Sequence, residues 1–175
     1  MLGVILPPSW RWAPQPGAEY RPRSGGEADL DWMRRLVSEG CRLFVIGAEG
    51  AAAANGFLAA SDHLCLFGDG PLVGPNDDAA GPRFPSLLGL YRAPEGPWRT
   101  GVVCRVPDWR FATPAELEAT GADALVSEGV GEAIVAGHGG AAVLLLVRCH
   151  AWRRWNAAEP PVPEAAAAAS GGLST

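Results

Sequence analysis

The sequence predicts an α/β fold, a single reduced domain in which a largely parallel or mixed sheet is flanked by helices. Short apolar runs typical of buried strands alternate with segments in which apolar residues recur at helical spacing. The length of 175 residues suits one hydrophobic core. A hydrophobic fraction of 48% with 19% charged residues is typical of a folded domain and excludes a disordered chain.

The N-terminal half contains the first strands and the first helix. Val4–Leu6 is a buried strand that ends at two prolines, and the Pro- and Gly-rich residues 13–27 are predicted to form a surface loop. Residues 28–39 have the apolar spacing of a helix, which Gly40 ends. A second buried strand follows at 43–46.

The C-terminal half continues the alternation of strands and helices. Thr113 and Glu116 form a capping-box pattern with Pro114 at the first helical position. The remaining predicted elements are strands at 63–67, 101–106, 124–126 and 143–147 and a helix at 132–138. We therefore expect one domain over residues 1–156, followed by a low-complexity Ala- and Pro-rich tail at 157–175.

Charge and cysteine content exclude several classes of partner. A net charge of −5 gives no general attraction to nucleic acid or to anionic membranes. No window of 18 apolar residues is present, and the N-terminus lacks a signal-peptide pattern, so we expect a cytoplasmic protein. Four separated cysteines without a C-x-x-C pair predict buried free thiols. We expect no metal and no cofactor.

Several motifs together resemble the trimeric purine nucleoside phosphorylase family. Ser61-Asp62-His63-Leu64, then residues 70–78 (GPLVGPNDD) and 81–85 (GPRFP), are similar to its S-D-H-[IL]-N-L, N-P-L-x-G-P-N-D-[DE] and G-x-R-F-P stretches. Residues 111–116 (FATPAE) resemble its [FY]-E-T-P-A-E. The resemblance covers roughly residues 28–150. It implies a purine-nucleoside-phosphorylase-like mixed sheet and a homotrimer that binds a small molecule.

The sequence departs from the family where the family binds phosphate and sugar. The family's glycine-rich loop after the first strand reads here as residues 7–11 (PPSWR), which cannot supply the same backbone N–H groups because proline has none. The family's R-x-H-x-Y-E-G segment has no counterpart in the sequence.

Residues that would contact the nucleoside differ as well. The purine-reading Glu of the family corresponds to Ala112, and the Met-Ser pair that contacts ribose and phosphate falls on Ser127 and Glu128. In the family's T-N-A-A-G-G motif, Gly47 replaces the Asn and Glu49 the second Ala. A carboxylate beside bound phosphate would repel it. The resemblance and its departures therefore predict a shortened, divergent member that has lost phosphorolysis.

We expect a repurposed pocket for a neutral or cationic small molecule. The predicted acid/base groups are Glu49, Glu128 and His150. The predicted substrate-binding residues are Gly47, Ala48, Trp109, Arg110, Phe111 and Ser127. All basic residues are Arg, which indicates a GC-rich bacterial genome, and cyclisation, elimination or hydrolysis in specialised metabolism would suit such a site. The alternatives are a non-catalytic scaffold or partner subunit, and a residual nucleosidase or phosphorylase.

Overall fold

The computed structural model of the protein describes residues 1–11, 13, 15–66, 70–72 and 89–152. These residues form a mixed seven-stranded sheet with helices, which confirms the predicted α/β class. The strands are β1 (Leu2–Leu6), β2 (Ala18–Pro22), β3 (Leu43–Ala52), β4 (Gly56–Cys65), β5 (Arg99–Arg105), β6 (Ala124–Val126) and β7 (Ala142–Ala151). The predicted tail at 157–175 lies outside the described residues, so the domain boundary stays a prediction.

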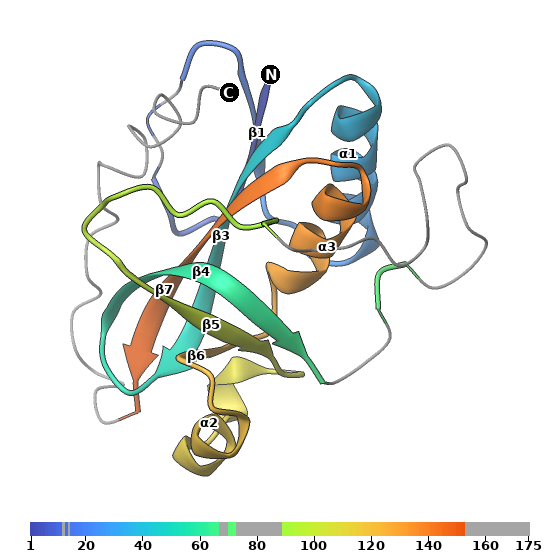
Figure 1. Cartoon of the computed structure of the whole chain (residues 1–175). Coiled ribbons are helices and arrows are strands. Elements are labelled where there is room, and N and C mark those ends of the chain that lie inside the picture. The colour runs from blue at the N-terminus through green and yellow to red at the C-terminus, as the bar shows by residue number, and fades with distance from the viewer. Residues whose placement is uncertain (12, 14, 67–69, 73–88, 153–175) are drawn as a thin grey trace.

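Strand β3 organises the sheet. It pairs in parallel with β1 and, over all ten of its residues, with β7, while its last three residues pair antiparallel with β6. Strand β4 pairs antiparallel with β7 and in parallel with β5, which in turn pairs with β6. The strands β3, β6, β5, β4 and β7 thus close into a ring, with β1 and β2 extending the sheet beyond β3 (Figure 1).

Two helices cover one face of the sheet. Helices α1 (Glu27–Ser38) and α3 (Val130–His138) lie side by side against β1, β3 and β7 (Figure 1). Helix α2 (Pro114–Thr120) lies apart from them beside β6, and its predicted capping box is present between Thr113 and Glu116. Within the described residues, no helix is long and apolar enough to cross a membrane.

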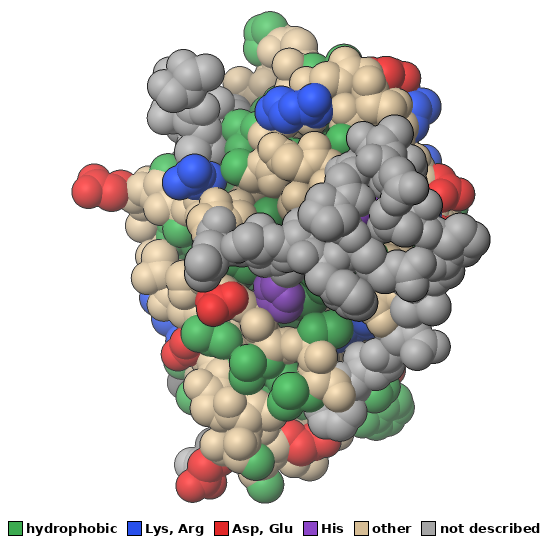
Figure 2. Space-filling view, turned by 45° about the vertical axis from the view of Figure 1, so that its right-hand side comes forward, with side chains coloured by type: hydrophobic (Ala, Val, Ile, Leu, Met, Phe, Trp, Pro, Cys, Tyr) green, Lys and Arg blue, Asp and Glu red, His purple; other side chains and the backbone are tan. Residues whose placement is uncertain are grey.

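The surface contains charges of both signs. On the face shown in Figure 2, acidic and basic side chains are scattered among apolar and polar ones instead of forming one basic patch. Of the four cysteines, Cys41, Cys104 and Cys149 are buried free thiols as predicted. Cys65 is exposed at the end of β4, so the prediction is wrong for this residue.

The sequence prediction missed two features of the sheet. The region 13–27, predicted as loop, contains β2, a parallel edge strand beside β1 whose polar sequence gives no strand signal. The strand predicted at 43–46 continues to Ala52, so residues 47–50 lie within β3. Small residues are needed there because an added Cβ at Gly50 would lie 2.6 Å from the carbonyl oxygen of Leu125.

The β2–α1 connection is held by one buried carboxylate. Asp29, in the first turn of α1, accepts hydrogen bonds from the backbone N–H groups of Ser24 and Gly25 and from the Ser24 hydroxyl. The guanidinium of Arg21 lies 2.8 Å from the same carboxylate. Burial opposes ionisation of Asp29, but these hydrogen bonds outweigh it and hold its pKa below the ordinary value.

We expect Asp29→Ala to lower the free energy of unfolding by about 3 kcal/mol, because buried backbone N–H groups lose a charged acceptor. Since the pKa of Asp29 is depressed by folding, its contribution is present at neutral pH and is lost as pH falls through that depressed pKa. Urea denaturation at neutral and acidic pH measures both effects. The control is Asp31→Ala, an exposed position on the same helix, and equal losses from the two variants would contradict the assignment.

Candidate functional site

The register of β3 against β7 places an acidic and a basic residue side by side. Glu49 on β3 pairs with Arg148 on β7, and His150 lies two residues further along the same face of β7. Arg148 has a side chain only 3% exposed, so its charge requires a nearby counter-charge. One guanidinium nitrogen of Arg148 lies 3.1 Å from Oε1 of Glu49.

Glu49 contacts three further side chains through hydrogen bonds, the longest of them 3.4 Å from the Ser9 hydroxyl to Oε1. The indole N–H of Trp10 donates to Oε1 at 2.9 Å, and Nε2 of His150 lies 2.6 Å from Oε2. The indole of Trp10, which follows the first strand, also lies beneath the Arg148 guanidinium at 5.1 Å. Both carboxylate oxygens of Glu49 are therefore occupied by donors, which come from the turn after β1 and from β7.

The Glu49 carboxyl is ionised at neutral pH. Burial raises its pKa, but hydrogen bonds from His150 and Trp10 and the positive charge of Arg148 outweigh burial, so the pKa lies below its ordinary value. Because an ionised carboxylate can only accept, the hydrogen in the Glu49–His150 contact resides on Nε2 of His150. The geometry is that of a carboxylate–imidazole dyad.

The indole ring of Trp109 orients the imidazole of the dyad. The two rings stack with centroids 5.1 Å apart and an interplanar angle of 11°. Trp109 begins the short 3₁₀ helix Trp109–Phe111, and its backbone N–H donates to the Ser127 hydroxyl at 2.7 Å. Ser127 directly precedes Glu128, so this chain of contacts connects the dyad to the third predicted acid/base residue.

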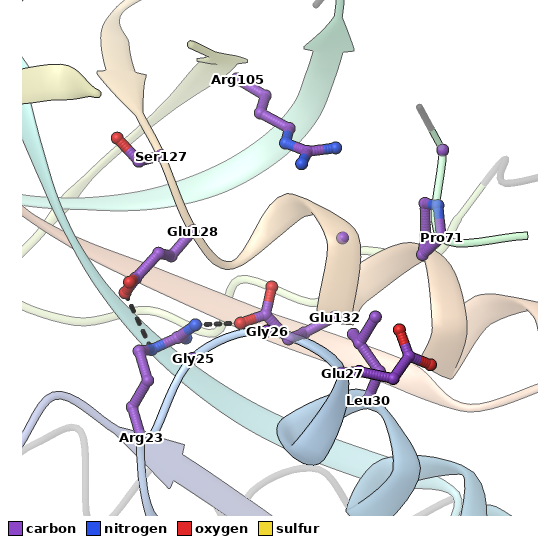
Figure 3. A pocket seen from close by; sticks show the side chains of 12 residues that line it. Arg23, Gly25, Gly26, Glu27, Leu30, Pro71, Arg105, Ser127, Glu128 and Glu132 are labelled. Atoms are coloured by element: carbon purple, nitrogen blue, oxygen red, sulfur yellow. Dashed lines mark hydrogen bonds and ion pairs between the residues drawn. The ribbon is translucent and has the colours of Figure 1, made fainter. Parts of the chain in front are cut away.

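Glu128 lies at the wall of a pocket of about 260 Å³. The pocket opens between the N-terminal ends of α1 and α3, and its lining includes Ser127, Arg105 and Pro71 (Figure 3). Arg23, directly after β2, extends between two carboxylates in this pocket. Its Nε lies 3.2 Å from Glu128, and the opposite edge of its guanidinium contacts Glu132 of α3 (Figure 3).

The pocket environment makes Glu128 easier to protonate than an exposed glutamate. Its side chain is 49% exposed. Partial burial raises the pKa of its carboxyl, Arg23 lowers it, and the negative charges of Glu132, Asp29 and Glu49 raise it again, with a net increase above the ordinary value. Glu49 and Glu128 are thus electrostatically coupled, and their pKa values shift in opposite directions.

The remaining predicted site residues divide into two groups. Gly47 lies at the site through its carbonyl, which accepts a 2.8 Å hydrogen bond from Arg23. The structure does not bring Ala48, Arg110 or Phe111 to the dyad: Ala48 is buried in the core cluster that includes α1 and α3, because its side chain points to the other face of β3. Arg110 pairs with Asp108 at the surface, and Phe111 is 82% exposed.

Sequence reasoning missed three residues of the site. These residues are Trp10 and Arg148, which contact Glu49, and Arg23, which contacts Glu128 and Glu132. A buried Arg in an apolar strand, as in residues 143–149 (VLLLVRC), is a usable signal because such a charge requires a partner. The contact between Trp10 and Glu49 joins positions 39 residues apart and gives no local signal.

The retained family-like motif is described only in part. His63 on β4 lies 2.9 Å from the Tyr91 hydroxyl through Nδ1, and their rings meet edge to face. Residues 73–85 of the motif lie outside the described part of the chain. Among the described residues, no group of three or more His, Cys, Asp or Glu side chains is arranged to hold a metal ion.

Comparisons with known proteins show a partial sequence similarity. The chain is 33% identical over 106 residues to purine nucleoside phosphorylase 1 of Bacillus subtilis, an alignment that covers 52% of this chain and 39% of that protein. It is 35% identical over 99 residues to purine nucleoside phosphorylase 1 of Geobacillus stearothermophilus, covering 48% and 36%. The chain therefore spans less than half the length of these curated relatives. No protein-family model matches it.

Solved structures show a similarity in fold over most of the chain. Schistosoma mansoni purine nucleoside phosphorylase with a monocyclic inhibitor superimposes with a TM-score of 0.72 at 17% identity, covering 86% of this chain and 80% of that one. The schistosome enzyme with hypoxanthine gives a TM-score of 0.69 at 17% identity, covering 98% and 85%. The chain therefore resembles purine nucleoside phosphorylases in sequence and has their fold.

We expect Glu49→Gln to lower the free energy of unfolding by about 3 kcal/mol, because it removes the negative charge that lies 3.1 Å from the buried Arg148 guanidinium. Because the pKa of Glu49 is depressed, this contribution is present at neutral pH and is lost as pH falls through the depressed pKa.

Glu128→Gln is the matched control. Glu128 is half-exposed, and in this variant Arg23 retains its contacts with Glu132 and the Gly47 carbonyl. The substitution should therefore lower the free energy of unfolding by less than about 1 kcal/mol. Chemical denaturation of both variants at pH 7 measures the two losses of unfolding free energy and shows which is larger. A smaller effect for Glu49→Gln than for Glu128→Gln would refute this account of the charges.

Proposed function

We propose that this chain, which has the purine nucleoside phosphorylase fold, is a phosphate-independent small-molecule enzyme of bacterial specialised metabolism. Its reaction class is acid–base chemistry such as cyclisation, elimination or hydrolysis. The observation that carries the proposal is the Glu49–His150 dyad, with 2.6 Å between Oε2 and Nε2. Ionised Glu49 accepts the hydrogen of Nε2 and thereby holds the imidazole in one tautomer.

The dyad assigns different roles to the two imidazole nitrogens. Nε2 donates to Glu49, so Nδ1 is the atom that exchanges a proton with the ligand. The stacked Trp109 ring keeps the imidazole plane fixed, which reduces the reorganisation that proton transfer requires. Arg148 and Trp10 act through Glu49 as positioning residues, because they keep its carboxylate ionised and oriented.

Glu128 supplies the second acid/base group. Its pKa is raised while that of Glu49 is lowered, which is the pattern expected when one carboxyl donates a proton and another stays ionised. Ser127 lies beside it in the wall of the pocket and supplies a hydroxyl for orienting a polar ligand. Glu49 and His150 are not among the residues that line this pocket, so the proposed ligand would have to extend from Glu128 to the dyad to use all three groups.

The charges of the pocket support a neutral or cationic ligand. Its lining contains three carboxylates, those of Glu27, Glu128 and Glu132, and two guanidiniums. The turn after β1 contains Pro7, Pro8 and Trp10, and the Trp10 indole donates to Glu49. A phosphate near these carboxylates would meet repulsion of about 3 kcal/mol for each pair of unit charges roughly 6 Å apart in a partly polar site.

Purine nucleoside phosphorolysis or nucleosidase activity is the second candidate. It is favoured by the 33% identity to a Bacillus purine nucleoside phosphorylase over about half the chain. Both candidates place the ligand near Ser127 and Glu128. They differ in whether phosphate binds and whether a purine base is released.

A thermal-shift screen separates these candidates before the substrate is known. We expect small amines and neutral heterocyclic compounds to raise the melting temperature, while phosphate and inosine leave it unchanged, because only ligands that bind the folded state stabilise it. A compound that binds is then incubated in deuterium oxide, and solvent deuterium in the recovered compound is measured by mass spectrometry.

Glu49→Gln and His150→Gln should each lower this exchange rate by about a hundredfold or more, the usual contribution of a general acid or base. The matched control is His138→Gln at the end of α3, which should exchange at the wild-type rate. Stabilisation by phosphate together with phosphate-dependent release of hypoxanthine from inosine would overturn the first candidate in favour of the second.

We also propose that the protein is a cytoplasmic homotrimer, as the family resemblance implies. Size-exclusion chromatography with light scattering should then give a mass near three times the chain mass of 18.2 kDa. A mass of 18.2 kDa that persists as the protein concentration is raised would refute the trimer without bearing on the dyad.

A further inference from the structure

A single buried guanidinium connects the pocket to the sheet. Arg23 follows β2, and its side chain is 4% exposed. It contacts acceptors on three separate elements: the Gly47 carbonyl of β3 at 2.8 Å, the Glu132 carboxylate of α3, and Glu128 between β6 and α3. A guanidinium with this many acceptors is a site at which anionic oxygen atoms collect.

The two carboxylates that contact Arg23 are held very differently. Glu132 is buried, and its second oxygen accepts the backbone N–H of Gly129 at 2.9 Å, so it is fixed by two donors. Glu128 is half-exposed and lies 3.2 Å from Nε of Arg23. Among the described residues this buried Nε forms no hydrogen bond, so the contact is an ion pair only. Glu128 is therefore the partner that another anion can replace.

The rest of the pocket would accept an anion if Glu128 were neutral. Two guanidiniums and three carboxylates line it, giving a formal charge of −1 that becomes zero without the Glu128 charge. The N-terminal ends of α1 and α3 border it through Gly26 and Gly131, and each contributes about half a positive charge. The balance near Arg23 then favours an oxyanion.

We propose that Glu128 is a specificity-determining residue: its carboxylate occupies the oxyanion position at Arg23 and thereby excludes anionic ligands from the pocket. An anionic oxygen group enters this position when Glu128 is protonated or removed. This role extends the proposed function, because it names Glu128 as the residue that selects against anionic ligands. It rests on the pocket geometry and not on the Glu49–His150 dyad being catalytic.

Several charges act on Glu128 and set the pH at which this exclusion operates. The positive groups are Arg23, Arg105 and Arg110, and the negative groups are Glu27, Asp29, Glu49 and Glu132. Their net effect with burial is a raised pKa, so Glu128 begins to take up a proton at a higher pH than an exposed glutamate. Exclusion should weaken as pH falls through this raised pKa.

Sulfate is the suitable probe because its charge stays constant between mildly acidic and neutral pH. We expect Glu128→Gln to bind sulfate at least about tenfold more tightly than the wild type at pH 8, as measured by isothermal titration calorimetry at constant ionic strength. Glu27→Gln is the matched control. It removes the same charge from the pocket lining, but Glu27 pairs with Arg34, so the gain should stay below about twofold.

A second measurement uses the wild-type protein alone. Its sulfate affinity should rise as pH falls, while that of Glu128→Gln should change little over the same range, since the titrating group is absent. Equal gains from Glu27→Gln and Glu128→Gln, or a wild-type affinity independent of pH, would overturn the inference. Neither sulfate experiment requires turnover. If sulfate binding behaves as expected but no deuterium exchange is found, the proposed enzymatic activity is wrong, while the role of Glu128 in excluding anions is supported.

Discussion

The parallel pairing of β3 with β7 is the constraint on which the site depends. Its ten-residue register places Glu49 opposite Arg148 and brings His150 to the same face. Side chains alternate between the two faces of a strand, so a slip of one residue would move Glu49 into the core beneath α1 and α3. The apolar residues 143–147 prevent such a slip, because their alternate side chains fill two separate core clusters.

Charge compensation is the second organising feature. Arg23 and Arg148 are both buried, and each is matched by carboxylates from other elements. Buried ion pairs add little net stability relative to apolar residues, but removing one partner is costly. Removal of Glu49 is therefore expected to be costly, whereas Arg23 keeps Glu132 when Glu128 is removed. The compensating carboxylates also belong to the proposed chemistry, because Glu128 would exchange a proton and ionised Glu49 would orient the imidazole that does so.

The fold is shared with purine nucleoside phosphorylases, and small residues on β3 shape the site within it. Small residues at Gly47 and Gly50 let neighbouring groups approach β3 closely: an added Cβ at Gly47 would lie 3.0 Å or less from Leu6, Pro7 and Trp10. This close approach allows the Trp10 indole to reach Glu49. A conserved backbone with a different set of charges is the usual way in which one fold carries different functions.

The sequence by itself determined the alternation of strands and helices, the capping box at Thr113 and the identity of the residues in the dyad, because hydrophobic periodicity, capping and ionisable type are local properties. It did not reveal the edge strand β2, whose polar sequence forms a strand only because β1 offers unpaired backbone groups. Nor did it show that Glu49 lies within a strand or that Arg23 joins Glu128 to Glu132. Those facts depend on contacts between residues far apart in the chain, so only the tertiary structure decided them.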